Sequence, residues 1–210
     1  MKKPLAGIIN ISTNNILSIK RALEFIDFDT ILINEHKPIE KFDLIVLPGV
    51  GAFNEAMNTL NKTNLLKTID QALNKNKKFL GICLGMQLLF QESNEFIKTK
   101  GIGFFNGKVE NFKSFPIHKK TFIGWNKVNF NKKFFENDEQ YYLLQKKSYY
   151  FVHSFFVNCT KKNIEFGNSI NGKLTYTSVV KKDNVIAFQF HPEKSGIDGL
   201  NLLKTTTRDI

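Results

Sequence analysis

The chain has 210 residues, 42% of them hydrophobic, so it can bury a sizeable core, and we expect a single domain over residues 1–210. Its net charge of +11 comes from lysines spread as short pairs, with arginine only at Arg21 and Arg208, which argues against a nucleic-acid interface. The two cysteines match no metal spacing, and no apolar run approaches the ~18 residues of a membrane helix. These features exclude a disulfide scaffold and a membrane-spanning protein, and they indicate a soluble protein of the cytoplasm.

The first half of the chain alternates between strand and helix patterns. Apolar runs predict strands at residues 5–9, 30–33, 44–47 and 79–82. Apolar residues at helical spacing predict helices over residues 15–26, over 54–73 with Asn54 as the cap, and after Cys83. This alternation predicts an α/β fold with a mostly parallel sheet and helices on both faces. Ligands then bind beyond the carboxyl ends of the strands, where residues 48–51 and Cys83 both lie.

The second half is rich in aromatic and β-branched residues from Gly101 onward. These residues predict strands, some of them antiparallel, at residues 121–130, 149–157, 175–180 and 185–190. A final helix is expected over residues 199–205. We therefore expect antiparallel strands to extend the parallel sheet of the first half.

Cys83 lies on the predicted turn from strand to helix, with Gly81 two residues before it and Gly85 two residues after. A turn of this kind forces strained backbone angles, and flanking glycines remove side chains that would clash. The pattern is the thiol counterpart of the nucleophile elbow, and the helix N-terminus favours a thiolate. The alternative is a buried structural cysteine, but the glycines and the change from strand to helix favour a catalytic nucleophile.

His191-Pro192-Glu193 follows the last predicted strand. Pro192 favours an extended His191, and side chains two residues apart in an extended chain face the same way. A general base and the carboxylate that orients it need this relation. A surface His-Glu pair is the alternative for this motif alone. Together with Cys83, a Cys-His-Glu triad is the better interpretation.

Five motifs are spread along almost the whole chain. They are Pro48-Gly49-Val50-Gly51-Ala52-Phe53, Gly81-Ile82-Cys83-Leu84-Gly85-Met86-Gln87-Leu88-Leu89-Phe90, Gly124-Trp125-Asn126, Tyr150-Phe151-Val152-His153-Ser154 and Gln189-Phe190-His191-Pro192-Glu193-Lys194-Ser195. Together they resemble the class I (triad-type) glutamine amidotransferases and, within them, the glutaminase subunits of imidazole glycerol phosphate synthase. The first and third motifs are specific to this branch.

The resemblance implies a flavodoxin-like amidotransferase fold and the hydrolysis of glutamine to glutamate and ammonia, without a cofactor or a metal. In this family the cysteine corresponding to Cys83 attacks the side-chain amide of glutamine. His191 then protonates the departing ammonia and activates the water that cleaves the glutamyl thioester. Glu193 corresponds to the carboxylate that orients this histidine.

The resemblance also implies positions for the oxyanion hole and for glutamine. The oxyanion donors correspond to the backbone of Leu84 and of the turn at Val50 and Gly51, where glycines beside Val50 make a peptide flip cheap. The hole could thus stay incomplete until a partner reshapes it. Residues that hold glutamine correspond to Gln87, Glu95, Ser154 and Phe155. For Gln87 and Glu95 the alternative is a polar helix face and a loop carboxylate.

The resemblance implies a heterodimer with a separate (β/α)8-barrel synthase that uses the ammonia to make imidazole glycerol phosphate and AICAR in histidine biosynthesis. Residues expected at that interface are Trp125, Asn126, Tyr150 and Lys194, with a buried core role as the alternative for Trp125.

Two segments depart from the family pattern. Asn10-Ile11-Ser12-Thr13-Asn14-Asn15 stands in place of Asp-Tyr-Gly-x-Gly-Asn, and Thr121-Phe122-Ile123 in place of Pro-His-Met. Both segments face the synthase in this family. A paralogous glutaminase that feeds a sugar-modifying synthase in surface-glycan biosynthesis therefore remains an alternative. A non-catalytic relative is a third hypothesis, but such a protein would have lost the nucleophile, the histidine or an elbow glycine.

Overall fold

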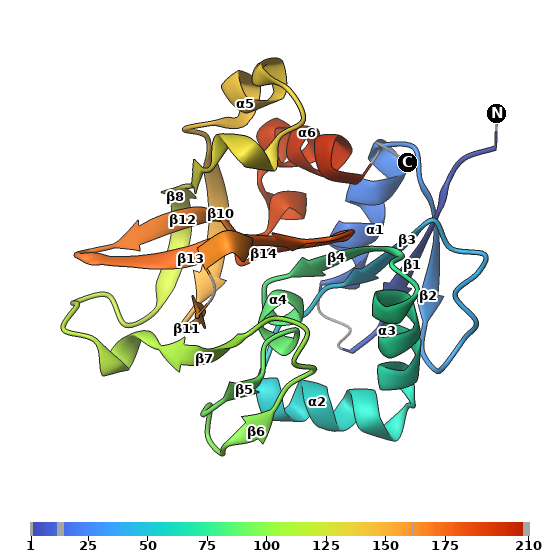
Figure 1. The fold of residues 1–210 in the computed structure, drawn as a ribbon, viewed down its shortest axis with the longest axis horizontal. Coiled ribbons are helices and arrows are strands. Elements are labelled where there is room, and N and C mark those ends of the chain that lie inside the picture. The colour runs from blue at the N-terminus through green and yellow to red at the C-terminus, as the bar shows by residue number, and fades with distance from the viewer. Residues whose placement is uncertain (1, 12–14, 161, 208–210) are drawn as a thin grey trace.

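The computed structural model describes residues 2–11, 15–160 and 162–207. Its main sheet has the strand order β2-β1-β3-β4-β14-β13-β11-β7-β5-β6, with β12 paired to β13 and β9 paired to β12 (Figure 1). The first five of these strands run parallel. They are β1 (Leu5–Ile9), β2 (Asp29–Ile33), β3 (Leu44–Leu47), β4 (Lys78–Ile82) and β14 (Val185–Phe188).

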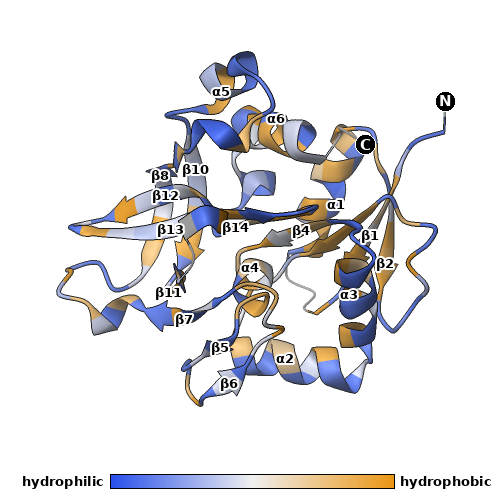
Figure 2. Ribbon diagram, viewed as in Figure 1, coloured by the Kyte–Doolittle hydropathy of each residue, from blue (hydrophilic) through white to orange (hydrophobic). Residues whose placement is uncertain are grey.

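Helices cover both faces of this parallel half (Figure 1). One face carries α1 (Ile16–Phe25) and α6 (Gly196–Thr207), and the other carries α2 (Phe53–Lys62), α3 (Leu65–Asn74) and α4 (Leu84–Leu88). Side chains alternate between the two cores along each strand, so Leu80 and Ile82 of β4 pack on the first face and Phe79 on the second. Figure 2 shows the resulting hydrophobic interior and the hydrophilic outer sides of α2 and α3.

The other half of the sheet is built mainly from antiparallel pairs, with β5 and β7 as a parallel exception. Its strands are β5 (Glu92–Ser93), β6 (Thr99–Lys100), β7 (Gly107–Asn111), β9 (Asn129–Phe130), β11 (Phe155–Cys159), β12 (Glu165–Asn171) and β13 (Leu174–Lys182). A separate antiparallel pair is formed by β8 (Phe122–Lys127) and β10 (Ser148–His153). The predicted fold class, a mostly parallel α/β sheet extended by antiparallel strands, is confirmed.

The prediction of one helix over residues 54–73, capped by Asn54, is wrong. Two helices occupy the segment, and Asn64, with φ 56°, turns the chain between them. The break lets each helix direct its own apolar side at the sheet, so that Leu60 and Leu65 are both fully buried. Asn54 lies inside the first turn of α2, where the N–H of Phe53 donates to the Glu95 carboxylate at 2.8 Å.

The second half contains more elements than the sequence predicted. The expected strands at 121–130 and 149–157 are each broken in two, because Val128 N–H donates to Lys147 and Ser154 O accepts from Phe112 N–H outside the ladders. The strand expected at 185–190 ends at Phe188. Elements that were not predicted are α5 (Asp138–Leu144), β7, β12 and the 3-10 helices η1 (Phe112–Ser114), η2 (Lys132–Phe134), η3 (Lys162–Ile164) and η4 (Pro192–Lys194).

Within residues 2–11, 15–160 and 162–207, none of the helices is long and apolar enough to cross a membrane.

Candidate active site

Cys83 is the N-cap residue between β4 and α4, at the carboxyl edge of the parallel strands, and has the strained backbone angles φ 54° and ψ −109°. Its N–H donates to the carbonyl of Phe188 in β14 at 2.7 Å, which ties the turn to the neighbouring strand. A side chain at Gly85 would overlap the carbonyl oxygen of Leu47, so only glycine fits there. The sequence prediction of a strained, glycine-flanked turn therefore agrees with the backbone geometry.

His191 lies beside this turn, and the way it meets Glu193 differs from the prediction. His191 itself is extended, but Pro192–Lys194 form the 3-10 helix η4, so the two side chains do not lie on one face of an extended chain. The tight turn instead brings His191 Nδ1 to 2.7 Å from Glu193 Oε1, with both side chains fully buried. The expected contact is present, but a helical turn produces it.

Asn15, which sequence reasoning left without a role, completes this cluster. Its Nδ2 donates to Glu193 Oε1 at 2.6 Å and lies 3.4 Å from His191 Nδ1. Asn15 is 3% exposed, so it holds the carboxylate from the α1 side with little competition from solvent. Asn15 is the asparagine that survives in the altered turn before α1, and Ser12 to Asn14 of that turn lie outside the described residues.

The charges around His191 favour its protonated form. Burial by itself lowers the pKa of His191, but the neighbouring Cys83 sulfur and the hydrogen-bonded Glu193 carboxylate outweigh it and raise that pKa to about 10. His191 Nε2 has no hydrogen-bond partner among the described residues. Because Glu193 engages Nδ1, Nε2 is the ring nitrogen left for proton transfer.

A pocket of about 300 Å³ opens beside Cys83. Its lining brings together all the residues expected to form the oxyanion hole and to bind glutamine. The lining residues are Val50, Gly51, Cys83, Leu84, Gln87, Glu95, Thr121, Val152, His153, Ser154 and Phe155. The pocket thus collects residues that follow β3, β4 and β5, together with residues of α4, β10 and β11.

The polar groups of this pocket are held by local hydrogen bonds. Gln87 Nε2 donates to the carbonyl of Phe155 at 2.9 Å, and the hydroxyls of Ser154 and Thr121 lie 2.8 Å apart. Burial raises the pKa of Glu95, while the N–H of Phe53 opposes the shift. One oxygen of Glu95 is thus already engaged by α2.

The expected oxyanion donor is engaged as well. The N–H of Leu84 donates to the carbonyl of Gly49 at 3.4 Å. The carbonyl of the Gly49–Val50 peptide therefore lies on the Leu84 side, where an oxyanion would need a donor. In this conformation the N–H of Leu84 is not available to a substrate.

Of the residues expected at a partner interface, Trp125 and Tyr150 lie side by side on β8 and β10, whereas Asn126 bonds toward β12 and Lys194 lies on η4. Trp125 is 57% exposed and packs edge-to-face on Tyr150, with ring centroids 6.2 Å apart. The alternative of a buried core tryptophan is therefore wrong. Asn126 donates to the carbonyl of Ile170 at 2.9 Å, and Lys194 is exposed on η4.

Two further polar residues beside Cys83 had no predicted role. Gln189 is fully buried, and its Nε2 lies 3.7 Å from Cys83 Sγ. His153 lines the pocket, donates through Nδ1 to the carbonyl of Phe155 at 2.7 Å, and has its pKa lowered by burial to about 4. Their only sequence signal was membership of the motifs that contain His191 and Ser154.

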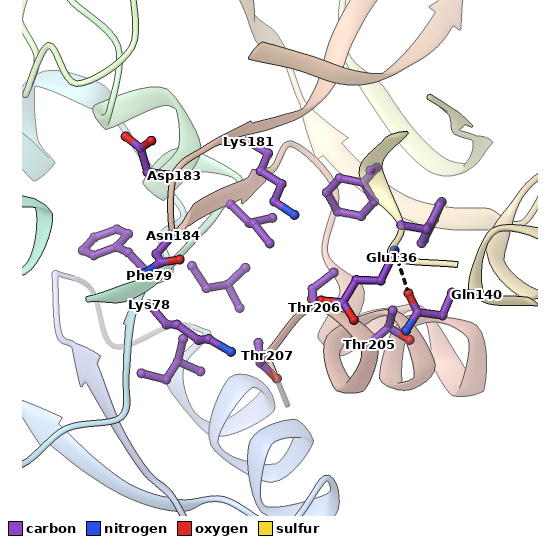
Figure 3. A pocket seen from close by; sticks show the side chains of 15 residues that line it. Lys78, Phe79, Glu136, Gln140, Lys181, Asp183, Asn184, Thr205, Thr206 and Thr207 are labelled. Atoms are coloured by element: carbon purple, nitrogen blue, oxygen red, sulfur yellow. Dashed lines mark hydrogen bonds between the residues drawn. The ribbon is translucent and has the colours of Figure 1, made fainter. Parts of the chain in front are cut away.

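A second pocket, of about 130 Å³, lies at the opposite, amino end of β4 and β14 (Figure 3). Lys78, Glu136, Gln140 and Lys181 line it, and none of the predicted site residues does. Across the part of the chain that the structure describes, no group of three or more His, Cys, Asp or Glu side chains could hold a metal ion.

Comparison with known proteins decides the family. The sequence model of the family described as glutamine amidotransferase class-I matches residues 6–207. The chain belongs to the class I glutamine amidotransferase family.

Curated relatives place this amidotransferase more narrowly. The imidazole glycerol phosphate synthase subunit HisH of Caldanaerobacter subterraneus subsp. tengcongensis is 38% identical to it over 205 residues, 95% of this chain and 96% of that protein. The subunit of the same name from Aquifex aeolicus is also 38% identical, over 96% of this chain and 95% of that protein. These similarities confirm the branch to which the motifs pointed.

The fold agrees with solved structures. The structure of PurLQS from Thermotoga maritima matches this amidotransferase with a TM-score of 0.76 at 18% identity, over 99% of both chains. At this level of identity the match supports the fold alone.

Proposed function

We propose that this amidotransferase is the glutaminase subunit of an imidazole glycerol phosphate synthase. It hydrolyses glutamine to glutamate and ammonia, and a separate (β/α)8-barrel subunit uses the ammonia to make imidazole glycerol phosphate and AICAR. The observation that carries the proposal is the strained Cys83 turn beside a buried His191–Glu193 pair at the edge of a pocket. The full-length similarity to synthase subunits supports the assignment of the pathway.

The geometry supports a nucleophilic first step. The Cys83 thiolate attacks the side-chain carbonyl carbon of glutamine and forms a tetrahedral oxyanion. Since the neighbouring Cys83 sulfur and Glu193 carboxylate raise the pKa of His191, the imidazolium form is favoured and can act as the acid. It gives its Nε2 proton to the departing amide nitrogen, and ammonia leaves a glutamyl thioester on Cys83.

The second step reverses the role of His191. Its neutral ring takes a proton from water, and the resulting hydroxide attacks the thioester carbonyl. Glutamate leaves, and the Cys83 thiolate and the imidazolium are restored. Glu193 Oε1 accepts from Nδ1 throughout, so it holds the tautomer in which Nε2 carries out the proton transfers.

The oxyanion hole requires a change in the turn after β3. In the described conformation the Gly49 carbonyl accepts from the N–H of Leu84. Rotation of the Gly49–Val50 peptide frees that donor and aims the N–H of Val50 at the oxyanion. Gly49 has no side chain, and its ψ is one of the two backbone angles that turn this peptide, so the rotation is cheap. The isolated subunit is therefore expected to be slow.

The ammonia-using partner docks at the exposed surface of β8 and β10. Trp125 supplies exposed aromatic area there, with the half-buried Tyr150 packed against it, while Lys194 lies next to the buried His191–Glu193 turn. A docked barrel keeps ammonia from being protonated and lost to water. A cytoplasmic location fits the two cysteines, Cys83 and Cys159, which are not joined in a disulfide.

Glutamate release decides the proposal when it is measured for the chain alone, with a histidine-pathway barrel, and with that barrel plus its acceptor. We expect slow release from the chain alone and strong stimulation only in the third mixture. Equal, fast release in all three would point to a free-standing hydrolase. Stimulation by a sugar-modifying barrel alone would move the function to the surface-glycan alternative, which the names of the curated relatives do not favour.

A further inference from the structure

The carbonyl of Phe155 is the fixed point of a buried polar network beside Cys83. It accepts hydrogen bonds from His153 Nδ1 at 2.7 Å and from Gln87 Nε2 at 2.9 Å. A backbone carbonyl can only accept hydrogen bonds, so both neighbours must present N–H groups to it. The orientation of the Gln87 amide is therefore set by the backbone and does not depend on a choice between its oxygen and nitrogen.

The orientation of Gln87 sets that of Gln189. Gln87 Nε2 also lies 3.1 Å from Gln189 Oε1 and donates to it. Turning the Gln189 amide around would place two N–H groups against each other, so its oxygen must face Gln87. Its Nε2 then faces Cys83 Sγ at 3.7 Å. Gln189 is 0% exposed, so no water competes for this donor.

We propose that Gln189 is a positioning residue that favours the thiolate form of Cys83, with its polarity set by the Phe155 carbonyl through Gln87. An amide N–H interacts more strongly with a negatively charged sulfur than with a thiol. Because the N–H group is only a donor, it cannot stabilise the thiol by accepting a hydrogen bond from it. The same contact limits rotation of the sulfur. This inference rests on the proposed role of Cys83 as the nucleophile.

The effect of Gln189 can be separated from the charges nearby. The titratable groups around Cys83 are His191 and Glu193 at η4, His153 of β10 and Glu95 after β5. Gln189 carries no charge, and methionine has a similar length and is also neutral. Gln189→Met therefore removes the donor and leaves these four groups in place.

The test is the rate of iodoacetamide alkylation of Cys83 against pH, read by mass spectrometry of the Cys83 peptide in the full chain. In Gln189→Met we expect the midpoint of the profile to move up by about one pH unit, with about tenfold slower alkylation at neutral pH. Gln87→Met removes the group that orients Gln189, and we expect it to raise the midpoint by a smaller amount. Ser178→Ala is the matched control, since the Ser178 carbonyl accepts from the N–H of Gln189 while its buried hydroxyl takes no part in the network, and its profile should equal the wild type.

Thermal unfolding of each variant shows whether the fold is intact. A folded Gln189→Met with the wild-type profile would overturn the proposal, as would a shift of equal size in Ser178→Ala. If Gln189→Met does not fold, Gln87→Met decides. An unchanged profile in folded Gln87→Met would overturn the proposal, and a raised midpoint would support it. Failure of the proposed function is seen separately, as glutamate release that survives Cys83→Ala.

Discussion

At the scale of single residues, the site depends on backbone strain at Cys83. A residue other than glycine with φ 54° costs on the order of 1–3 kcal/mol, and the surrounding structure must maintain it. The hydrogen bond from Cys83 N–H to Phe188 and the close packing of Gly85 on Leu47 do so. The strained turn places Cys83 in the lining of the pocket, where the residue is 5% exposed.

Cys83→Ala tests this role directly. We expect glutamate release to be lost, because Cys83 is the sulfur among the described residues that line the pocket, while a partner synthase supplied with ammonium salts keeps its activity. Alanine fits the space of the cysteine, so the fold should remain. The measurement is glutamine-dependent against ammonium-dependent product formation in the complex. Equal loss of both activities would show that Cys83 has a structural role.

His153 gives a prediction for pH dependence. Burial lowers its pKa to about 4 from an ordinary value of 6.5, so the unfolded chain binds a proton more readily than the folded one between these values. Its contribution to the free energy of unfolding is complete above pH 6.5 and is lost as the pH falls toward 4. The loss is on the order of 3 kcal/mol.

Urea unfolding of the wild type and of His153→Gln at pH 7 and pH 4.5 measures this contribution. The variant has no proton to take up at this position, so its stability should fall less between the two pH values. Parallel pH dependence in both proteins would contradict the assignment to His153.

At the scale of elements, the position of α4 against β3 depends on Gly85. A methyl group there would overlap the carbonyl of Leu47, and neither backbone can move without opening the sheet. Gly85→Ala should lower the free energy of unfolding by more than about 4 kcal/mol or prevent folding. The measurement is the urea midpoint at constant m-value.

Gly103→Ala is the control for this variant. Gly103 has φ 76° and open space around it, so alanine there costs only backbone strain, about 1–2 kcal/mol. If Gly85→Ala were no worse than Gly103→Ala, the packing of α4 on β3 would not be what holds the Cys83 turn.

At the scale of the whole molecule, a variant of the exposed aromatic surface on β8 distinguishes a role in folding from a role in partner binding. Trp125 is 57% exposed, so Trp125→Ala should leave the unfolding temperature within a few degrees of the wild type. Stimulation of glutamate release by the acceptor-loaded barrel should fall by at least about tenfold, as for an interface anchor.

Tyr142→Ala on α5 is the matched control, because Tyr142 is 63% exposed and is also aromatic but belongs to another element. It should keep normal stimulation. Equal loss in both variants, or a loss of fold in Trp125→Ala alone, would remove Trp125 from the interface.

The sequence by itself determined the parallel half of the fold and the position of the Cys83 turn. Strands such as 5–9 and 44–47 are short, fully apolar runs between polar segments, and burial on both faces leaves such runs few alternatives. The turn was predictable because a strained backbone beside a crowded strand admits only glycine at Gly85. Local sequence was therefore enough to predict both the parallel strands and the Cys83 turn.

Only the tertiary structure decided how the polar groups meet. The contact of His191 with Glu193 arises from a 3-10 turn, and Asn15 reaches it from α1 across most of the sequence. Gln189 faces Cys83 because Gln87 and the Phe155 carbonyl orient it, and Trp125 is exposed because β8 and β10 form a separate sheet. Such contacts depend on the long-range pairing of buried donors and acceptors, for which no pattern in the neighbouring residues exists.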